Sequence, residues 1–519
     1  MHRNLSAIAS RQGLNIVEAL PGHPRHVAER RPHTQSTRLK ALLQHFKNRS
    51  LLAVRRHGSA PPGSSARLRG LRGIAGPEVS DAQVIDARGL VLAPGFIDTH
   101  YHGTLPIHYR LALRNGVTSI MDLEFGTLGD EVGAWYEERT GTSLINFGTA
   151  SSHELARAAV LDGVRARDTS EAAKARRAPR WSRAVPTDAE QAAILAMLDA
   201  GLQAGAIGVG STLGYMPGVT GKGLYDIQAL AGRYGRQVSV HLRRTPGTDV
   251  DEINGAQEIL ANAVALKAPA MINHFNNPGW RQVHTLLRAL QAQGHNVWGE
   301  IYPYAAGSTT INAVFFERAN WVERLGRRYE DIFDPTAQRF LDEESFLTLR
   351  ERDPTHVVIA YKMPEAEVVQ WLGLPGTSLA SDGLPALRPF PLEMPLEDLP
   401  NAHPRAAGTY AKALRLAREQ GLPLMPILRQ ASTESAEHLA ALGLSAMAER
   451  GRVQEGAIAD LVLFDPETVT DHSTYAEGSR PATGFAYVFV AGQPVLKADR
   501  VDLGATPGRA LRFPPVSPR

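Results

Sequence analysis

Two histidines end a short apolar run near residue 100 and have a spacing that suits metal binding. The run covers residues 89–103, GLVLAPGFIDTHYHG, in which a Pro-Gly pair precedes His100 and His102. If the run is a strand, alternate residues at its end point to the same side, so both imidazoles face one site. Two such histidines make up half of a metal site. The alternative is two incidental polar residues at a strand end, because so short a motif often occurs by chance.

Four further candidate ligands end or follow other strand-like runs, namely Glu124, His241, His274 and Asp382. Taken singly, a histidine in such a run is more often a core residue, and a glutamate after it is more often a cap or a solvated end. Taken together, imidazoles and carboxylates on convergent strand ends suit a divalent ion. We therefore expect one or two divalent ions as the cofactor, with zinc first among them.

The elements that must position these residues form a regular series from residue 96 onward. Strand-like runs ending in polar residues recur and predict an α/β fold, a (β/α)₈ barrel of the TIM type, with chemistry at the carboxyl ends of its strands. Long connections at 152–205 and 305–377 exceed ordinary loops and predict helical insertions or a lid, with a possible extra strand at 356–361. The eight runs are 96–102, 118–124, 143–151, 206–212, 238–243, 270–273, 297–304 and 378–382, and helical patterns lie at 188–204, 225–234, 250–266 and 281–293.

The length of 519 residues suits one large domain and one small domain. We assign residues 95–439 to the catalytic barrel. Residues 81–94 and 440–512, which flank it, would form the small domain, which the family resemblance described below implies is a β-sandwich. Residues 1–80 stand apart as a basic leader.

Charge separates this leader from the rest of the chain. Residues 1–80 contain 14 Lys and Arg against 3 Glu, a net charge of +11, which leaves −8 on the remaining 439 residues. The leader also contains the low-complexity run GSAPPGSS at 58–65, and Phe46 is its one aromatic residue. Such a segment is more often disordered than bound to nucleic acid, so we expect disorder and treat nucleic-acid binding as the weaker alternative.

Composition narrows the chemistry further. The chain has no cysteine, so disulfides, thiolate nucleophiles and cysteine-type zinc sites are excluded. It has no apolar run of about 18 residues, the length that would span a membrane, and its beginning lacks the apolar core of a secretory signal. We expect no membrane partner and a cytoplasmic location.

The segment PGFID before His100 resembles the first barrel strand of the amidohydrolase superfamily, metal-dependent hydrolases of amides, ureas and esters. The segment MDLEFG at 121–126 is similar to the second strand of N-acyl-D-glutamate deacylases, which place a glutamate where D-aminoacylases often have a cysteine. Superfamily members usually begin with several short strands that join the C-terminal strands, and here only 82–87 is similar, so the small domain is expected to be incomplete. Further segments that resemble this branch are 208–218, 302–309, 381–385, 403–405 and 408–409, and those at 451–465 and 486–495 resemble the superfamily in general.

The resemblance implies a division of roles among the ligands. His100, His102 and Asp382 would hold one ion, His241 and His274 the other, and Glu124 would bridge them. A bound ion lowers the pKa of its water toward 7 and polarises the scissile carbonyl. Asp382 would be the catalytic base, taking a proton from the water and giving it to the leaving amine.

The resemblance also implies which residues bind the substrate. Arg405, in a His-Pro-Arg context, matches the arginine that holds the α-carboxylate of the acyl amino acid, and its planar fork suits a carboxylate. Tyr302 and Ser308 match helpers at the same carboxylate. Arg243 is a further candidate at the substrate, and Arg244 and Arg388 are candidates for a side-chain carboxylate.

The resulting hypothesis is a metal-dependent hydrolase that cleaves N-acyl-D-amino acids, N-acyl-D-glutamate first, to a carboxylate and a free D-amino acid. The alternatives are a D-aminoacylase for neutral side chains, a cyclic-amide hydrolase, a barrel that only binds its ligand, and a nucleic-acid binder that uses the basic leader. A homo-oligomer is compatible with all of them.

Overall fold

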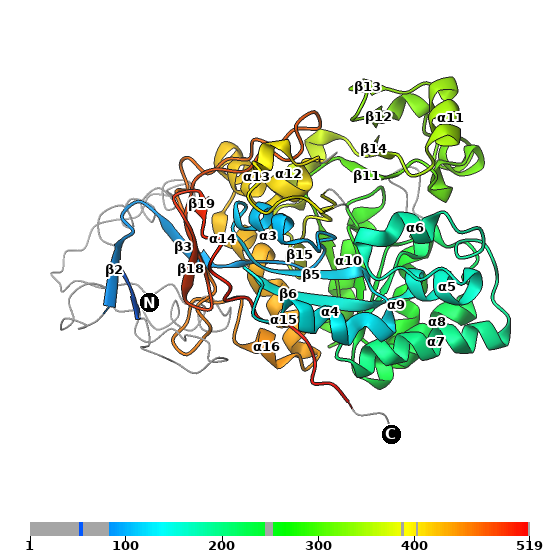
Figure 1. The fold of residues 1–519 in the computed structure, drawn as a ribbon, viewed down its shortest axis with the longest axis horizontal. Helices are drawn as coiled ribbons and strands as arrows, with labels where there is room; N and C mark the ends of the chain where they lie inside the picture. Colours follow the sequence, from blue (N-terminus) through cyan, green and yellow to red (C-terminus); the bar gives the residue numbers. More distant parts are fainter. Residues whose placement is uncertain (1–50, 56–81, 244–252, 386–388, 401–402, 517–519) are drawn as a thin grey trace, which may run out of the picture.

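Eight parallel strands lie side by side at the centre of the computed structural model, which describes residues 51–55, 82–243, 253–385, 389–400 and 403–516 (Figure 1). Strands that follow one another in this part of the chain are neighbours in the sheet. A parallel bridge between Tyr101 and Gly383 joins the two edges. The predicted (β/α)₈ barrel is therefore confirmed. Its strands are β4 (Phe96–Asp98), β5 (Val117–Thr127), β6 (Asn146–Ser152), β7 (Gly208–Ser211), β8 (Gln237–Val240), β9 (Ala270–Ile272), β10 (Val297–Ile301) and β15 (Thr377–Leu379).

Helices cover the outside of this sheet, and the four predicted helical patterns fall on α7, α8, α9 and α10. A capping box marks the start of α7. The Thr187 hydroxyl accepts a hydrogen bond from the Glu190 amide, and the Glu190 carboxylate accepts one from the Thr187 amide. Of the predicted range 250–266, residues 250–252 lie outside the described residues. The helices around the barrel are α3 (Pro106–Leu113), α4 (Val132–Arg139), α5 (His153–Asp162), α6 (Ala172–Arg176), α7 (Asp188–Gln203), α8 (Gly221–Arg233), α9 (Asn254–Leu266), α10 (Trp280–Ala292), α12 (Val368–Trp371), α13 (Arg405–Gln420), α14 (Leu424–Leu428), α15 (Glu434–Ala441) and α16 (Ser445–Ala448).

The two long connections differ in kind. The connection at 152–205 consists largely of α5, α6 and α7, as predicted. The connection at 305–377 instead carries a four-stranded antiparallel sheet and the helix α11 (Glu343–Arg352), which stand at one end of the barrel in Figure 1. The predicted extra strand is β14, but the rest of the sheet was not expected. Its strands are β11 (Ala306–Thr310), β12 (Ile332–Asp334), β13 (Arg339–Phe340) and β14 (Val357–Tyr361).

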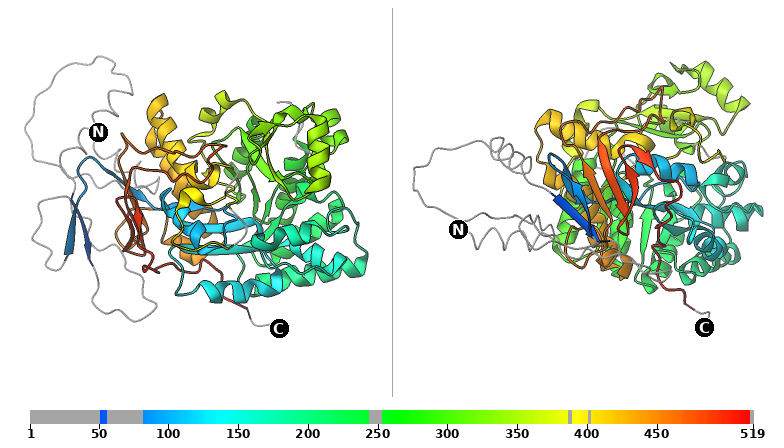
Figure 2. Two further views of the ribbon diagram at one scale, coloured as in Figure 1. Left: turned by 45° about the horizontal axis from the view of Figure 1, so that its top comes forward. Right: turned by 60° about the vertical axis from the view of Figure 1, so that its left-hand side comes forward.

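The small β domain lies against the opposite end of the molecule (Figures 1 and 2). It has a five-stranded antiparallel sheet, and Ile85 packs onto this sheet against Leu461, Leu463 and Phe489. The predicted boundary at residue 439 falls inside α15. The strands of the sheet are β3 (Val91–Pro94), β16 (Leu461–Phe464), β17 (Phe485–Val490), β18 (Gln493–Lys497) and β19 (Arg500–Val501).

A further strand lies within the segment that was expected to be a disordered leader. β1 (Leu51–Arg55) pairs antiparallel with β2 (Ala82–Asp86). The expected disorder of residues 1–80 as a whole stays a prediction. Residues 1–50 and 56–81 lie outside the described residues.

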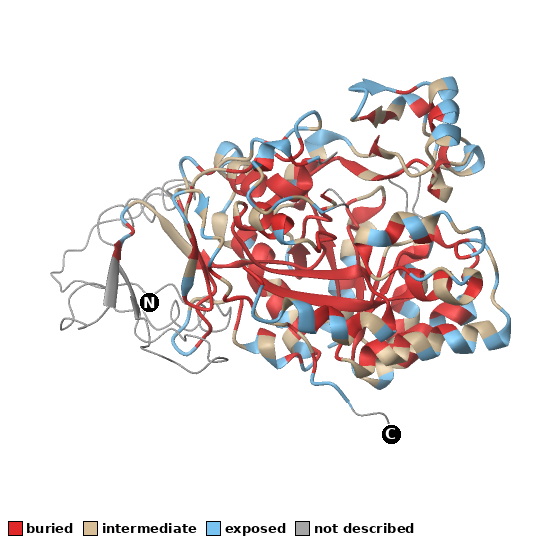
Figure 3. Cartoon of the chain, in the orientation of Figure 1, coloured by how far each residue is buried: buried red, intermediate tan, exposed pale blue. Residues whose placement is uncertain are grey.

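The centre of the barrel is buried, and its strands β5 and β6 are buried along their whole lengths (Figure 3). Apolar side chains from several barrel strands, among them Met121, Met271 and Trp298, form one cluster with Leu511 and Phe513 from the end of the chain. Of the helices that the structure describes, none is long and apolar enough to cross a membrane.

Candidate metal centre

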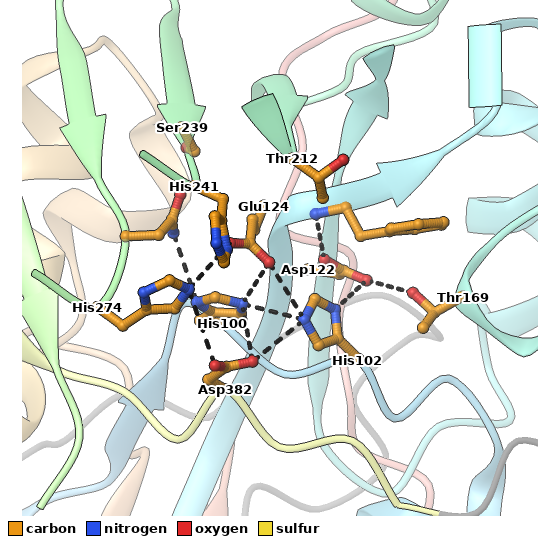
Figure 4. Close-up of polar contacts among 12 residues, drawn as sticks. His100, His102, Asp122, Glu124, Thr169, Thr212, Ser239, His241, His274 and Asp382 are labelled. Carbon is orange, nitrogen blue, oxygen red and sulfur yellow. Dashed lines mark hydrogen bonds and ion pairs between the residues drawn. The ribbon is translucent and has the colours of Figure 1, made fainter. Parts of the chain in front are cut away.

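The six predicted metal ligands come together at the carboxyl ends of the barrel strands (Figure 4). They form two groups that share one carboxylate. The ligand atoms of each group lie within 4.8 Å of one another. The first group is His100, His102, Glu124 and Asp382, and the second is Glu124, His241 and His274.

The spacing within the first group fits a tetrahedral ion. Ligands about 2.0–2.1 Å from a tetrahedral centre lie roughly 3.3–3.4 Å from one another. His100 Nε2 lies 3.0 Å from His102 Nε2, 3.1 Å from Glu124 Oε2 and 3.3 Å from Asp382 Oδ1. His102 Nε2 lies 3.5 Å from Glu124 Oε2 and 3.4 Å from Asp382 Oδ1. Five of the six distances among the four donors are therefore close to the edge length of one coordination tetrahedron.

The second group uses the other oxygen of the shared carboxylate. Glu124 Oε1 lies 2.9 Å from His241 Nδ1 and 3.1 Å from His274 Nε2. Asp382 Oδ2 lies 3.8 Å from His274 Nε2. Because Oε2 faces one group and Oε1 the other, Glu124 is placed to bridge two ions.

The pKa values of His100 and His102 are shifted in the opposite direction from that of His241. Although burial opposes their protonation, the surrounding carboxylates hold the pKa of His100 and of His102 well above the usual value. Burial, reinforced by the neighbouring His274, lowers the pKa of His241 to about 4. Burial raises the pKa of Glu124, but His100 and His241 outweigh it and hold that pKa well below its usual value. An ion entering the first group must displace protons from His100 and His102, because only the neutral imidazole binds a metal.

Two carboxylates that were not predicted as site residues, Glu300 and Asp122, hold the imidazoles of His100 and His102 in place. Glu300 Oε1 accepts a hydrogen bond from His100 Nδ1 at 2.5 Å, and Asp122 Oδ2 accepts one from His102 Nδ1 at 3.1 Å. Such carboxylates fix the ring orientation of a metal ligand and raise its basicity. A signal was present in the sequence, since Glu300 interrupts the apolar run VWGEI and Asp122 lies two residues before Glu124 on the same face of β5.

The backbone is strained at two of the ligands. Asp382 has a φ of 50° and His274 a φ of 27°, both in the left-handed region that residues with side chains rarely adopt. Two contacts hold the turn at Asp382: the Ser381 amide donates to Asp98 Oδ1 at 3.0 Å, and the His102 amide donates to the Gly383 carbonyl at 2.8 Å. Strain of this kind persists where the surrounding structure fixes a functional geometry.

Three of the four predicted substrate-binding residues lie beside the ligand cluster. Arg405, the first residue of α13, is buried, and its Nη1 lies 2.8 Å from Asp382 Oδ2. Its guanidinium stands over the Tyr302 ring at 5.1 Å, and its Nη2 donates to the Ser308 carbonyl at 3.4 Å. All three line one cavity with five of the six metal ligands.

Arg243 lines the same cavity, but protein groups occupy its fork. Its Nε donates to Glu258 Oε2 at 2.9 Å, its Nη2 pairs with Glu258 Oε1, and its Nη1 donates to the Val219 carbonyl at 2.6 Å. A role for Arg243 at the substrate therefore stays a prediction. Arg244 and Arg388 lie outside the described residues.

The barrel and this donor set together define a class of protein, the metal-dependent hydrolases of the amidohydrolase superfamily. A search against models of protein families finds no match. The chain is 31% identical over 484 residues to the N-acyl-D-aspartate deacylase of Alcaligenes xylosoxydans xylosoxydans, covering 82% of this chain and 86% of the relative. It therefore belongs to the N-acyl-D-amino acid deacylase family of that superfamily.

Two further similarities agree with this family. The D-aminoacylase of the same organism is 29% identical over 507 residues, with 88% of this chain and 95% of the relative covered. The crystal structure of N-acyl-D-glutamate deacylase from Bordetella bronchiseptica, complexed with zinc and a phosphonate mimic of the tetrahedral intermediate, superposes with a TM-score of 0.64 at 25% identity. That alignment covers 82% of this chain and 90% of the other.

Proposed function

We propose that the protein hydrolyses the amide bond of N-acyl-D-amino acids, with N-acyl-D-glutamate as the first expected substrate. The observation that carries this proposal is the position of Arg405, a buried guanidinium 2.8 Å from Asp382 at the edge of the ligand cluster. One cavity thus offers a group for a carboxylate beside a group for the scissile amide.

The ligand set fits one or two divalent ions, held by His100, His102, Glu124 and Asp382 and by Glu124, His241 and His274. When bound, such an ion would lower the pKa of its water toward 7 and would itself polarise the amide carbonyl.

Asp382 would carry the proton through the reaction. Burial raises its pKa, but Arg405 and His100 outweigh this and hold that pKa well below its usual value, so the group is in the ionised form that a base requires. As the water oxygen bonds to the acyl carbon, one water proton passes to Asp382. The C–N bond then breaks, and Asp382 returns that proton to the amine nitrogen, which leaves a carboxylic acid and a free amino acid. The acid then loses its remaining proton to solvent and becomes a carboxylate.

Arg405 would fix the hand of the substrate. If its guanidinium binds the α-carboxylate, with Tyr302 and Ser308 beside it, and the acyl carbonyl lies at the ligand cluster, two points of the amino acid are fixed. The side chains of the D and L forms then point to different places, so one hand is strongly preferred. The family supports the D hand.

A panel of N-acetyl amino acids of both hands, assayed on the zinc-loaded protein, tests the proposal. We expect hydrolysis of the D series and its loss in the Asp382→Asn variant. Preference for the L series would contradict the assignment, and hydrolysis of hydantoins alone would support the cyclic-amide alternative. A preference for neutral D-amino acids would support the D-aminoacylase alternative.

Nucleic-acid binding also stays a prediction. Nucleic-acid binding would depend on residues 1–80, most of which lie outside the described residues. Its test is salt-dependent retention on DNA that is lost when this segment is deleted. The cytoplasmic location and the homo-oligomer stay predictions.

A further inference from the structure

A lysine from the insertion at 305–377 reaches the substrate cavity. Lys362 follows β14, which pairs with β11 so that Ala306 stands opposite Tyr361, and its amide donates to the Ala305 carbonyl at 3.3 Å. Side chains alternate across a strand, so Lys362 lies on the same face as Ala360, and both line the cavity that holds the metal ligands and Arg405.

A glycine on the paired strand makes room for this lysine. A Cβ atom at Gly307 would lie 2.9 Å from Lys362 Cε, 3.2 Å from its Nζ and 3.3 Å from the Tyr302 hydroxyl. The ammonium and the hydroxyl thus flank the same point, which only a residue without a side chain leaves open. Gly307 therefore places the charge of Lys362 beside Tyr302, the residue that also lies against Arg405.

Three of the four arginines that line the same cavity pair with a carboxylate, whereas Lys362 pairs with none that the structure describes. Arg176 pairs with Glu154, Arg243 with Glu258 and Arg405 with Asp382. Among the residues that the structure describes, no carboxylate lies within 4.0 Å of Lys362 Nζ.

The surroundings of Lys362 favour an incoming anion. Burial and the nearby Arg405 lower the pKa of Lys362 to about 8, so at neutral pH the group is charged in a place that disfavours the charge. A carboxylate brought by the substrate would pair with this ammonium and relieve that cost.

We propose that Lys362, given its place by Gly307, binds the side-chain carboxylate of the substrate and so selects N-acyl derivatives of acidic D-amino acids. The proposal rests on the proposed function, because it assumes that Arg405 binds the α-carboxylate. With that carboxylate at Arg405, a second carboxylate is the group that Lys362 is free to bind. A neutral side chain would leave the lysine unpaired, which is a basis for rejecting it.

The test compares substrates that differ only in charge. N-acetyl-D-glutamate and N-acetyl-D-glutamine are nearly isosteric, as are N-acetyl-D-aspartate and N-acetyl-D-asparagine. We expect wild-type kcat/KM to favour the acid of at least one pair, and the Lys362→Met variant to reduce that acid-to-amide ratio by about 10- to 100-fold. Gly307→Ala, which keeps the lysine but displaces it, should reduce the same ratio. Lys222→Met removes a surface lysine paired with Asp226 and should leave the ratio unchanged.

The outcomes separate this inference from the proposed function. Hydrolysis of none of the four compounds by the zinc-loaded wild type would overturn both. Equal hydrolysis of acids and amides by the wild type would overturn only the role of Lys362. An equal loss on all four compounds in Lys362→Met would also overturn it, because it would place the lysine at the α-carboxylate or in the structure. Lys362→Gln provides a second variant if Lys362→Met fails to fold.

Discussion

Replacing Glu300 by glutamine should weaken metal binding at the first ligand group and spare the second. Glu300 accepts hydrogen bonds from His100 Nδ1 at 2.5 Å, Thr99 Oγ1 at 2.8 Å and Asn273 Nδ2 at 2.8 Å. Glutamine has nearly the same shape. Its amide oxygen can serve His100 and Asn273, while its NH₂ group can donate to Thr99, whose hydroxyl can also accept. The substitution therefore removes little except the negative charge behind the imidazole.

The expected size follows from that lost charge. Removing a carboxylate that supports a ligating histidine typically reduces metal affinity or activity by about 10- to 100-fold, or roughly 1.4 to 2.7 kcal/mol. Glu300 supports His100, which belongs to the group with His102 and Asp382. The ion held by His241 and His274 should therefore keep nearly all of its affinity.

Zinc content measured over a series of buffered free-zinc concentrations gives the affinity of each group. Asp122→Asn, the corresponding change behind His102, should act in the same direction. Glu258→Gln removes a carboxylate that pairs with Arg243 in the same cavity but supports no ligand, and should change neither affinity. Thermal unfolding in the presence of a chelator shows whether each metal-free variant is folded.

Two results would refute this reasoning. An unchanged affinity at both groups in a folded Glu300→Gln protein would mean that the carboxylate does not support metal binding. An equal loss at both groups would mean that the two groups are one coupled site, in which Glu124 spreads any change to all the ligands.

Three further predictions concern catalysis and pH. Asp382→Asn should reduce kcat by about 10² to 10⁴ while much of the metal stays bound, and full activity in that variant would remove Asp382 as the base. Arg405→Lys keeps the charge but loses the fork, and kcat/KM should fall by roughly 10- to 100-fold for every acyl-D-amino acid; a loss limited to D-glutamate would move Arg405 to the side-chain pocket. The pKa of Lys362 is lowered to about 8, so its charge is present below pH 8 and is lost above it. The preference for N-acetyl-D-glutamate over N-acetyl-D-glutamine should therefore decline as the pH rises from 7 to 9, and should stay flat in Lys362→Met.

The barrel and its six metal ligands could both be predicted from the sequence because both depend on local patterns. Each ligand stands at or just after the end of an apolar run, and the carboxyl ends of parallel strands meet at one edge of a barrel. His100 and His102 are two residues apart on one strand, so their shared direction follows from alternation alone. The capping residues Thr187 and Glu190 mark the start of α7 in the same local way.

What the sequence could not predict depends on contacts between distant segments. Lys362 enters the cavity only because β14 pairs with β11, about fifty residues earlier in the chain, and no local pattern reveals that register. Glu300 stands out in its apolar run, but its contact with His100 joins positions 200 residues apart and could not be predicted. Arg243 has the chemistry of a substrate ligand, but its partner Glu258 on the helix after its strand can be identified only in the folded chain.

The position of Lys362 in an insertion also bears on how the substrate specificity of such a protein could change. The ligands that would activate water and amide stand on the barrel, whereas Lys362 and Gly307 belong to a segment that leaves the barrel after β10 and returns at β15. If Lys362 binds the side chain of the substrate, substitutions in β11 and β14 that displace it would alter which amino acid is accepted while leaving the six metal ligands unchanged. Replacing the corresponding segment of a relative by residues 305–363 would then transfer the preference for acidic side chains in one step. The metal ligands of the recipient would stay as they are.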